Sequence, residues 1–308
     1  MITTVTLNPA IDITYYIPEF QRSQIHRVDS MYKEPGGKGI NVAKVIKTLK
    51  APVMVTGMLG GNNGRTICRL LDSYSIPHDF HPISGESRLC LNIIDQHAHQ
   101  TEILEKGPEV SEKELGNFKR HLEKLSKKSR FVIFSGSLPA GVPQYAYGEL
   151  IELVQHHGAD AIVDTSGKAL EYALAAKPFM VKPNINEVQE IYSQKKLTKE
   201  DVWKIIENWH DSGISASMVS DGADGMMVRI HEHQWTISPP VVKAVNTVGC
   251  GDTLAGALAV GFYNDQTYEE CLINATAAAV SNAMEKQAGK VSIEKIDQYK
   301  QGITLKKE

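Results

Sequence analysis

Short runs of apolar residues alternate with amphipathic segments along most of the chain. Runs in which nearly every residue is apolar predict buried β-strands. The strand candidates are residues 2–7, 53–58, 131–134, 161–164, 179–182 and 217–220. Strands that are apolar on both faces and separated by helices belong to parallel sheets covered on two sides. The pattern therefore predicts an α/β fold with a mostly parallel central sheet.

Between these runs, apolar residues recur every three or four positions, which predicts helices. The helix candidates cover residues 39–49, 111–125, 150–154 and 198–209. Ser111 and Glu114 have the spacing of a capping box, which marks the start of the second helix. Residues 60–64 are rich in Gly and Asn, and we expect them to form a turn that closes the strand before them.

Two stretches, residues 12–33 and 88–106, interrupt this alternation. They contain segments in which apolar and polar side chains alternate, as half-exposed strands do. We interpret them as strands of a separate small sheet, a lid inserted into the core. No repeat or Pro-rich linker marks a boundary, so residues 1–308 are expected to form a single domain.

Composition narrows the class of protein. The chain has 308 residues, 42% of them apolar, and a net charge of −3, which argues against a nucleic-acid partner. No apolar stretch approaches the roughly 20 residues that cross a bilayer, and no signal peptide is evident. The four scattered cysteines predict free thiols in a reducing compartment. We therefore expect a cytoplasmic protein without a membrane partner.

The strongest chemical signal lies in residues 246–257. Gly249 and Gly251 allow a tight turn, and the apolar segment after them predicts a buried helix. The N-terminus of such a helix offers unpaired N–H groups to an anion. Asp252 at this turn is suited to accept the proton of an attacking hydroxyl. From the residues alone, an equally good interpretation is that Asp252 caps its helix.

A second Gly-rich turn leads into a helix at residues 34–43. Lys38 and Asn41 would project from the first turn of this helix toward a ligand. The spacing is not that of a P-loop, so the segment does not by itself predict an NTP site. An ordinary strand-to-helix connection is the alternative. Three glycines around one lysine favour the ligand interpretation.

Three weaker candidates follow predicted strands, where α/β sheets place their ligands. Residues 135–139 end one strand, and residues 182–187 follow another. Glu187 in the latter segment is suited to organise the water shell of Mg²⁺. Residues 220–225 form a Gly-rich loop that would suit a nucleotide, although such hairpins are common without ligands.

Five segments together resemble the PfkB branch of the ribokinase superfamily, and the resemblance covers essentially the whole chain. They are residues 6–12, 35–43, 135–141, 181–184 and 247–253. The opening Thr-Leu-Asn-Pro-Ala-Ile-Asp is further similar to that of hexose-phosphate kinases. The resemblance implies a ribokinase-like three-layer α/β/α sandwich with a small β-sheet lid. It also implies in-line transfer of the γ-phosphoryl group of ATP with Mg²⁺, and a homodimer formed through the lid. A monovalent cation binds in some relatives.

The resemblance also assigns residues to roles. It implies a catalytic base and anion hole at Gly249, Cys250, Gly251 and Asp252. It implies substrate contacts at Asp12, Arg27, Gly37, Lys38, Asn41, Arg88, Cys90 and Ser137. It implies nucleotide contacts at Lys182, Asn184, Ser220, Gly222, Gly225 and Gly251, and a metal contact through water at Glu187.

The chain departs from the family pattern at a few positions. Cys250 stands where Ala is usual, and Cys90 stands where several relatives have Asn. A thiol at a helix N-terminus favours the thiolate, so a redox-sensitive site is one hypothesis for Cys250 and a small filler is the favoured one. Asp221 replaces an apolar residue of the nucleotide loop and has no explanation. Residues 100–104 are similar to those of tagatose-6-phosphate kinases.

The favoured activity is that of a 1-phosphofructokinase, which converts fructose 1-phosphate and ATP into fructose 1,6-bisphosphate and ADP. Tagatose 6-phosphate or fructose 6-phosphate as acceptor is the alternative within the same chemistry. A sugar-phosphate or nucleotide sensor without catalysis is the alternative from another class, and a structural homodimer is a third. A sensor has no need of the base, so the presence of Asp252 together with the two glycines of the turn, Gly249 and Gly251, favours the enzyme.

Overall fold

Ten strands form the central sheet of the computed structural model, which describes residues 1–97 and 99–308. Their order is β14-β13-β12-β11-β10-β9-β8-β1-β4-β5. The parallel part consists of β1 (Ile2–Thr6), β4 (Val53–Gly60), β5 (His81–Ile83), β8 (Phe131–Ser135), β9 (Asp160–Asp164), β10 (Met180–Val181) and β11 (Ala216–Ser220). An antiparallel edge of β12 (Met226–Ile230), β13 (His233–Ser238) and β14 (Thr304–Lys307) follows. The predicted α/β fold with a mostly parallel sheet is confirmed.

Both faces of this sheet are buried, as the apolar runs predict. In β8, Phe131 and Ile133 belong to one hydrophobic cluster, whereas Val132 and Phe134 belong to a second cluster on the opposite face. Successive side chains of a strand point to opposite faces, so a strand covered on both sides is apolar at every position. Successive side chains of β8 enter hydrophobic clusters on opposite faces of the sheet, which explains why its sequence has no polar face.

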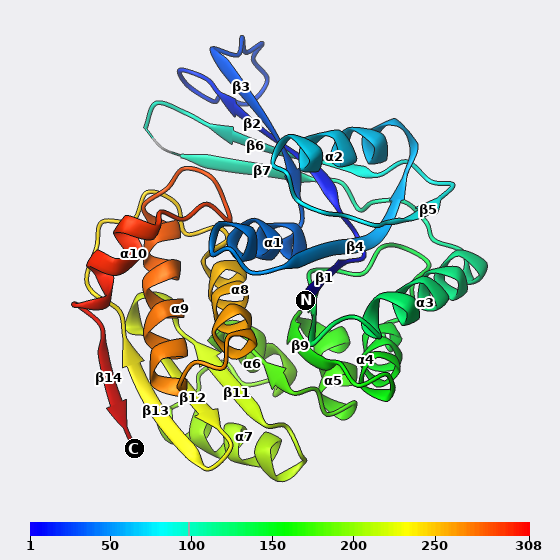
Figure 1. Cartoon of the computed structure of the whole chain (residues 1–308). Helices are drawn as coiled ribbons and strands as arrows, with labels where there is room; N and C mark the ends of the chain where they lie inside the picture. Colours follow the sequence, from blue (N-terminus) through cyan, green and yellow to red (C-terminus); the bar gives the residue numbers. More distant parts are fainter. Residues whose placement is uncertain (98) are drawn as a thin grey trace.

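Helices cover the two faces and complete three layers (Figure 1). One layer holds α1 (Lys38–Thr48), α2 (Gly61–Ser73), α8 (Cys250–Tyr263), α9 (Tyr268–Ala283) and α10 (Ile293–Lys300). The other holds α3 (Glu112–Ser126), α4 (Ala146–His156), α5 (Gly167–Ala175), α6 (Ile185–Ile191) and α7 (Lys199–Asp211). The predicted capping box of Ser111 and Glu114 is present at the start of α3.

A four-stranded sheet in the order β3-β2-β6-β7 forms the lid at the top of Figure 1. Its strands are β2 (Ala10–Tyr16), β3 (Ser30–Gly36), β6 (Arg88–Ile94) and β7 (Gln100–Leu104). The lid strands lie close to the predicted stretches 12–33 and 88–106, although β3 continues to Gly36 and leads into α1. Ala98 lies outside the described residues. Met31, Tyr32, Ile103 and Leu104 of the lid are exposed.

The prediction of a turn over residues 60–64 is wrong, because α2 begins there at Gly61. A distant residue supplies the missing start signal. The carboxylate of Glu86 accepts a hydrogen bond from the backbone N–H of Asn63, and the Asn63 side chain donates to the Ser87 carbonyl. The free N–H groups of a helix start need such acceptors. Here the acceptor is 23 residues away in the sequence, where local pattern cannot show it.

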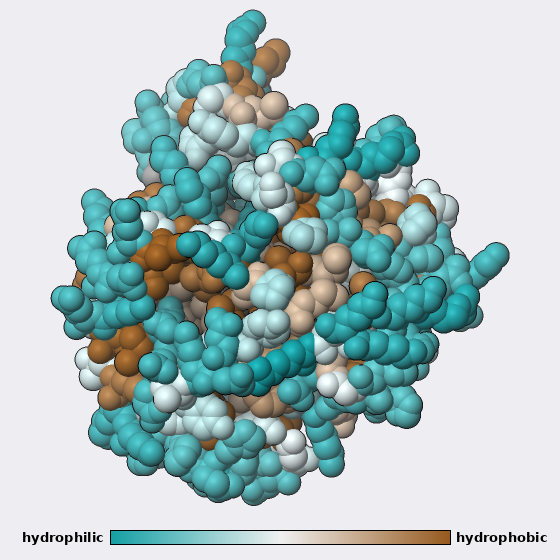
Figure 2. Space-filling model, viewed as in Figure 1, coloured by the Kyte–Doolittle hydropathy of each residue, from teal (hydrophilic) through white to brown (hydrophobic). Residues whose placement is uncertain are grey.

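One face of the molecule is mostly hydrophilic (Figure 2). Figure 2 shows hydrophilic side chains over most of one face, with hydrophobic surface visible below the lid. Over the part of the chain that the structure describes, every helix is too short or too polar to cross a membrane.

Candidate active site

A cavity of about 1270 Å³ lies between the lid and the carboxyl ends of the parallel strands. This edge is where ligands bind in open α/β sheets. The cavity wall contains most of the predicted site residues, namely Asp12, Gly37, Lys38, Asn41, Arg88, Cys90, Lys182, Asn184, Glu187, Ser220, Gly222, Gly225, Gly249, Cys250, Gly251 and Asp252. Arg27 and Ser137 are exposed and lie outside this wall. The substrate contacts expected for these two residues stay predictions.

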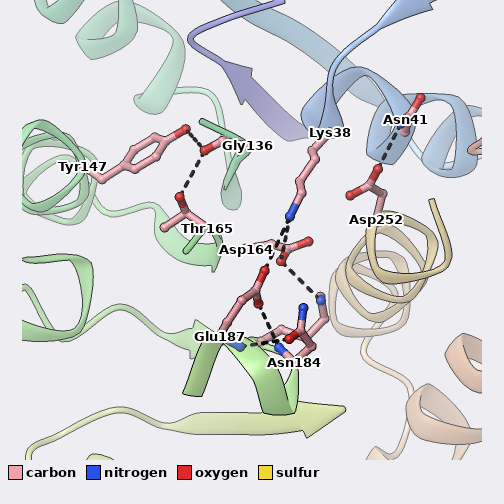
Figure 3. Close-up of polar contacts among 10 residues, drawn as sticks. Lys38, Asn41, Gly136, Tyr147, Asp164, Thr165, Asn184, Glu187 and Asp252 are labelled. Carbon is pink, nitrogen blue, oxygen red and sulfur yellow. Dashed lines mark hydrogen bonds and ion pairs between the residues drawn. The ribbon is translucent and has the colours of Figure 1, made fainter. Parts of the chain in front are cut away.

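Asp252 lies in the first turn of α8 and is 5% exposed. Its Oδ2 atom accepts a 2.9 Å hydrogen bond from the Asn41 side chain of α1 (Figure 3). The N-cap of α8 is Gly249, and no side chain caps this helix, so the capping interpretation of Asp252 is wrong. Its carboxylate is turned toward α1 and the cavity instead.

Burial is the main reason that the pKa of Asp252 is raised to about 6. The nearby Asp164 carboxylate raises this pKa further. The Lys38 ammonium, the hydrogen bond from Asn41 and the Lys182 ammonium act in the opposite direction. A carboxyl group with such a pKa is ionised at neutral pH and is still a stronger base than an exposed aspartate.

The turn before α8 has the geometry of an anion-binding site. Gly249 adopts a left-handed conformation with φ of 83°, which only glycine adopts readily. Within the described residues, the backbone N–H groups of Gly251 and Asp252 have no hydrogen-bond acceptor. Unpaired donors at a helix N-terminus attract negative charge. The turn therefore presents two free donors beside the Asp252 carboxylate.

Asn282 of α9 holds this turn from behind. It is fully buried, and its Nδ2 donates to the Val248 carbonyl at 2.9 Å. Its Oδ1 accepts from the Gly289 backbone at 2.8 Å. The sequence analysis did not single out Asn282, because an amide inside a helix carries no local signal. Its position fixes the turn before any ligand binds.

Two lysines and two carboxylates face each other across the cavity floor. Lys182 and Asp164 are both buried, and Lys182 Nζ lies 3.3 Å from Asp164 Oδ1. Lys38 reaches from α1 to lie 4.0 Å from Asp164 and 3.8 Å from Glu187 (Figure 3). The acidic neighbours, Asp164 first, raise the pKa of Lys38, so its ammonium stays charged. Sequence reasoning missed Asp164, whose only signal is its place at the carboxyl end of β9.

Asn184 and Glu187 serve their own helix. Asn184 Oδ1 accepts from the Glu187 backbone, and Glu187 Oε2 accepts from the Asn184 backbone, so the pair forms a capping box on α6. Glu187 keeps its Oε1 turned toward Lys38. Burial raises the pKa of the Glu187 carboxyl. The cap thus aims one carboxylate oxygen into the cavity.

The lid contributes Asp12, Arg88 and Cys90 to the upper wall. Burial raises the pKa of Asp12 to about 6 and that of Cys90 to about 11. The Arg88 guanidinium donates to the carbonyls of Asn8 and Glu105, both at 3.1 Å, which fixes its orientation. A fixed guanidinium on a cavity wall is suited to a phosphate or carboxylate.

A family model matches this chain over residues 5–295, and its description is pfkB family carbohydrate kinase. The chain belongs to the PfkB family of carbohydrate kinases. The resemblance noted in the sequence is thereby confirmed, and with it phosphotransferase chemistry.

The similarity to known proteins extends over almost the full chain. A tagatose-6-phosphate kinase of Staphylococcus epidermidis is 37% identical over an alignment of 305 residues that covers 97% of this chain and 97% of that one. The crystal structure of phosphofructokinase-2 from Escherichia coli with potassium has a TM-score of 0.92 at 28% identity, covering 97% of this chain and 98% of that one. A Thermotoga maritima protein described as a possible 1-phosphofructokinase has a TM-score of 0.90 at 26% identity, covering 100% and 99%.

Cys250 marks a difference between this PfkB kinase and the pattern of its family. Burial raises the pKa of its thiol, and the Asn282 side chain donates to Sγ at 3.5 Å. Burial thus disfavours the thiolate at this helix N-terminus, and a small side chain filling a small space stays the favoured interpretation.

No group of three His, Cys, Asp or Glu side chains that could hold a metal ion by itself occurs in residues 1–97 and 99–308. Mg²⁺ usually binds through one or two carboxylates together with substrate phosphates and waters. Asp164 and Glu187 offer such a pair on the cavity floor.

Proposed function

We propose that the protein is an ATP-dependent kinase that phosphorylates a hydroxyl of a ketohexose phosphate, with tagatose 6-phosphate as acceptor. One observation carries the proposal. The Asp252 carboxylate lies at the N-terminus of a buried helix, on the cavity wall, and Asn41 binds one of its oxygens. The other oxygen, Oδ1, has no hydrogen-bond partner among the described residues, so it is free to meet a substrate hydroxyl.

Asp252 Oδ1 would accept the proton of the acceptor hydroxyl as the hydroxyl oxygen attacks the γ-phosphorus of ATP. The bond from the γ-phosphorus to the β,γ-bridging oxygen breaks, and ADP leaves with that oxygen. The pKa of about 6 leaves this carboxylate ionised at neutral pH. General bases of this kind contribute about 10²–10⁴-fold to the rate. Asn41 would keep the carboxylate in place during the transfer.

The transferred phosphoryl group carries negative charge that the protein must stabilise. The free N–H groups of Gly251 and Asp252 would donate to its oxygens. The ammonium groups of Lys38 and Lys182 supply two positive charges on the same floor. The nucleotide itself would lie along Asn184, Ser220, Gly222 and Gly225, as the resemblance implies.

Mg²⁺ is the metal expected for such a kinase. Asp164 and Glu187 are hard oxygen donors that face the same ammonium, and Glu187 would act through water. When bound, the ion neutralises charge on the ATP phosphates. Potassium accompanies phosphofructokinase-2 in its crystal structure, which supports testing a monovalent cation as an activator here.

The acceptor is the finer part of the proposal. The opening motif is similar to those of hexose-phosphate kinases in general and does not separate the acceptors, whereas the 37% identity with a tagatose-6-phosphate kinase favours tagatose 6-phosphate, which we adopt. Tagatose 6-phosphate and fructose 6-phosphate differ at one carbon, and fructose 1-phosphate carries its phosphate at the other end. Arg88 on the lid wall would bind the phosphate in each case.

We also propose a homodimer through the lid. Met31 of β3 and Ile103 of β7 are 47% and 52% exposed and do not line the cavity, whereas their neighbours Tyr32 and Leu104 do. Exposed apolar side chains such as Met31 and Ile103 favour burial against a partner. Sedimentation equilibrium tests this proposal. The mass of a dimer is expected for the wild type, and the mass of a monomer for a Met31→Lys, Ile103→Lys variant.

An ADP-release assay with a panel of acceptors tests the activity. The panel contains tagatose 6-phosphate, fructose 6-phosphate, fructose 1-phosphate and the two free sugars. We expect kcat/KM for tagatose 6-phosphate to exceed the others by at least about tenfold, which corresponds to about 1.4 kcal/mol. A preference for fructose 1-phosphate would overturn the assignment of tagatose 6-phosphate as the acceptor. Binding of ATP and sugar phosphate without ADP release would indicate the sensor.

Arg88→Met provides the matched variant for this panel. It is expected to remove most of the preference for phosphorylated over free sugar. Arg69→Met, on the exposed side of α2, serves as the control and should leave the preference unchanged.

A further inference from the structure

Lys44 lies one helical turn after Asn41 on α1 and has no place in the mechanism above. Its Nζ donates to Asn41 Oδ1 at 3.5 Å, and Asn41 Nδ2 donates to Asp252 Oδ2 at 2.9 Å. Figure 3 shows the second of these bonds. Lys44 is not part of the cavity wall, so it acts on the reaction through Asn41 and through the attraction between its charge and the Asp252 carboxylate.

Lys44 donates to Asn41 and Asn41 donates to Asp252, and this order is set by Lys44, because an ammonium group can only donate hydrogen bonds. Lys44 therefore requires the oxygen end of the Asn41 carboxamide to face it. The NH₂ end of the same group then faces Asp252. A donor pointing at Asp252 Oδ2 favours the ionised carboxylate, since an ionised carboxylate only accepts hydrogen bonds.

Lys44 is held in place from several elements. Glu34 of β3, Asp12 of β2 and Asp252 of α8 are the acidic groups that face it, and they oppose the effect of burial, which lowers its pKa. Its Nζ lies 5.9 Å from the centroid of the Tyr74 ring. The Tyr74 hydroxyl in turn donates to Glu34 Oε1 at 3.0 Å. This arrangement keeps the ammonium beside Asn41.

We propose that Lys44 is a positioning residue that fixes the orientation of the Asn41 carboxamide and thereby keeps Asp252 free of a proton. The proposal rests on the role of Asp252 as the base. Besides Lys44, the charged groups that face Asp252 are Asp164, Lys38 and Lys182, and these three remain unchanged when Lys44 is replaced.

Without Lys44, the Asn41 carboxamide is free to turn by 180°. Its oxygen would then face Asp252 and accept a hydrogen bond from the protonated carboxyl group. The protonated form would gain a partner, and the ionised form would lose one. Asp252 would accordingly lose its proton only at higher pH.

The first test compares the pH profiles of kcat for the wild type, Lys44→Met and Lys44→Arg. We expect the acidic limb to move up by about one pH unit in Lys44→Met, which is a tenfold change in the proton equilibrium, with kcat at pH 9 within about threefold of wild type. The arginine side chain also can only donate hydrogen bonds, so the acidic limb of the Lys44→Arg profile should lie at the wild-type pH. Lys47→Met, at an exposed position of the same helix, is the control that should change nothing. An unmoved limb in Lys44→Met would overturn the proposal.

A second measurement does not depend on turnover. The difference in Tm between chains with Asp252 and with Asp252→Asn, followed from pH 4 to 9, reports the titration of Asp252. In the Lys44→Met background this difference should change sign or size at a higher pH than in the wild-type background. A shifted titration without turnover on any acceptor would remove the kinase proposal and leave the positioning role. An unshifted titration would contradict the positioning role alone.

Discussion

Asn41 and Asp252 are 211 positions apart in the sequence and share a buried hydrogen bond of 2.9 Å. This bond connects the N-terminal turns of α1 and α8. The two helices approach closely farther along as well, because a Cβ on Gly256 would lie 3.0 Å from the Val42 carbonyl. The two Gly-rich motifs of the sequence thus meet at one point, where a carboxylate is held between two helix starts.

The turn before α8 should tolerate no side chain at Gly249. A Cβ there would lie 2.9 Å from the Ala288 Cβ and the Gly289 nitrogen, in addition to the left-handed φ. We expect Gly249→Ala to lower the free energy of unfolding by about 1–3 kcal/mol and kcat by at least about tenfold. Urea unfolding and the ADP-release assay measure the two effects.

Gly116→Ala on α3 is the matched control, because a Cβ there meets nothing within 4 Å. It should stabilise the protein by about 0.4–1 kcal/mol and leave kcat unchanged. If Gly249→Ala and Gly116→Ala had the same free energy of unfolding and the same kcat, the turn at Gly249 would not be sterically constrained.

Breaking the buried pair of Asp164 and Lys182 should strongly destabilise the folded protein. Asp164→Asn leaves the Lys182 ammonium buried without its partner carboxylate, which typically costs about 3–5 kcal/mol. We also expect a higher Mg²⁺ concentration for half-maximal rate in this variant. Chemical unfolding and a Mg²⁺ titration of the rate are the measurements.

Asp160→Asn, at the exposed start of the same strand, is the control and should change unfolding by less than about 0.5 kcal/mol. If Asp164→Asn were as stable as this control, the pair would not be a structural element of the site.

The raised pKa of Asp252 predicts a cost in stability at high pH. Below the ordinary value of 3.8, both folded and unfolded chains carry the proton, and the effect is absent. As pH rises toward about 6, the unfolded chain loses the proton first, so the folded state becomes less favoured. Above that pH the cost is complete, at about 3 kcal/mol.

Asp252→Asn should therefore be more stable than wild type at pH 8, because its amide is neutral and accepts the same bond from Asn41. Thermal unfolding across pH measures this difference in Tm. The gain should shrink as pH falls through 6 and vanish near pH 4. A gain that is constant with pH would mean that Asp252 does not titrate in this range.

Much of this arrangement could be predicted from the sequence because the signals are local. The apolar run before Phe262 predicts a buried α8, and Ser111 with Glu114 predicts the start of α3. The start of α2 was missed because its acceptor, Glu86, is supplied by tertiary structure. The Gly-rich and Asn-rich sequence of residues 60–64 is compatible with both a turn and a helix start, and only the position of the Glu86 carboxylate in the fold distinguishes them.

Asp164 was missed for a related reason. At the end of a strand, an aspartate bound to two lysines cannot be told from one that faces solvent, since Lys38 and Lys182 come from other elements. The capping role of Asn184 and Glu187 has a local spacing, but the sequence analysis assigned these residues to ligands alone. Pairings within an element can be found from spacing, whereas pairings between elements require the fold.

The turnover of Asp252→Asn tests the account most directly. ATP binding, measured by calorimetry on wild type and variant, should agree within about threefold, because the amide keeps the bond to Asn41 and the N–H groups of the turn. Under saturating ATP and tagatose 6-phosphate, kcat of the variant should fall by at least about 100-fold. A variant that binds ATP normally and retains the wild-type kcat would contradict the assignment of Asp252 as the base.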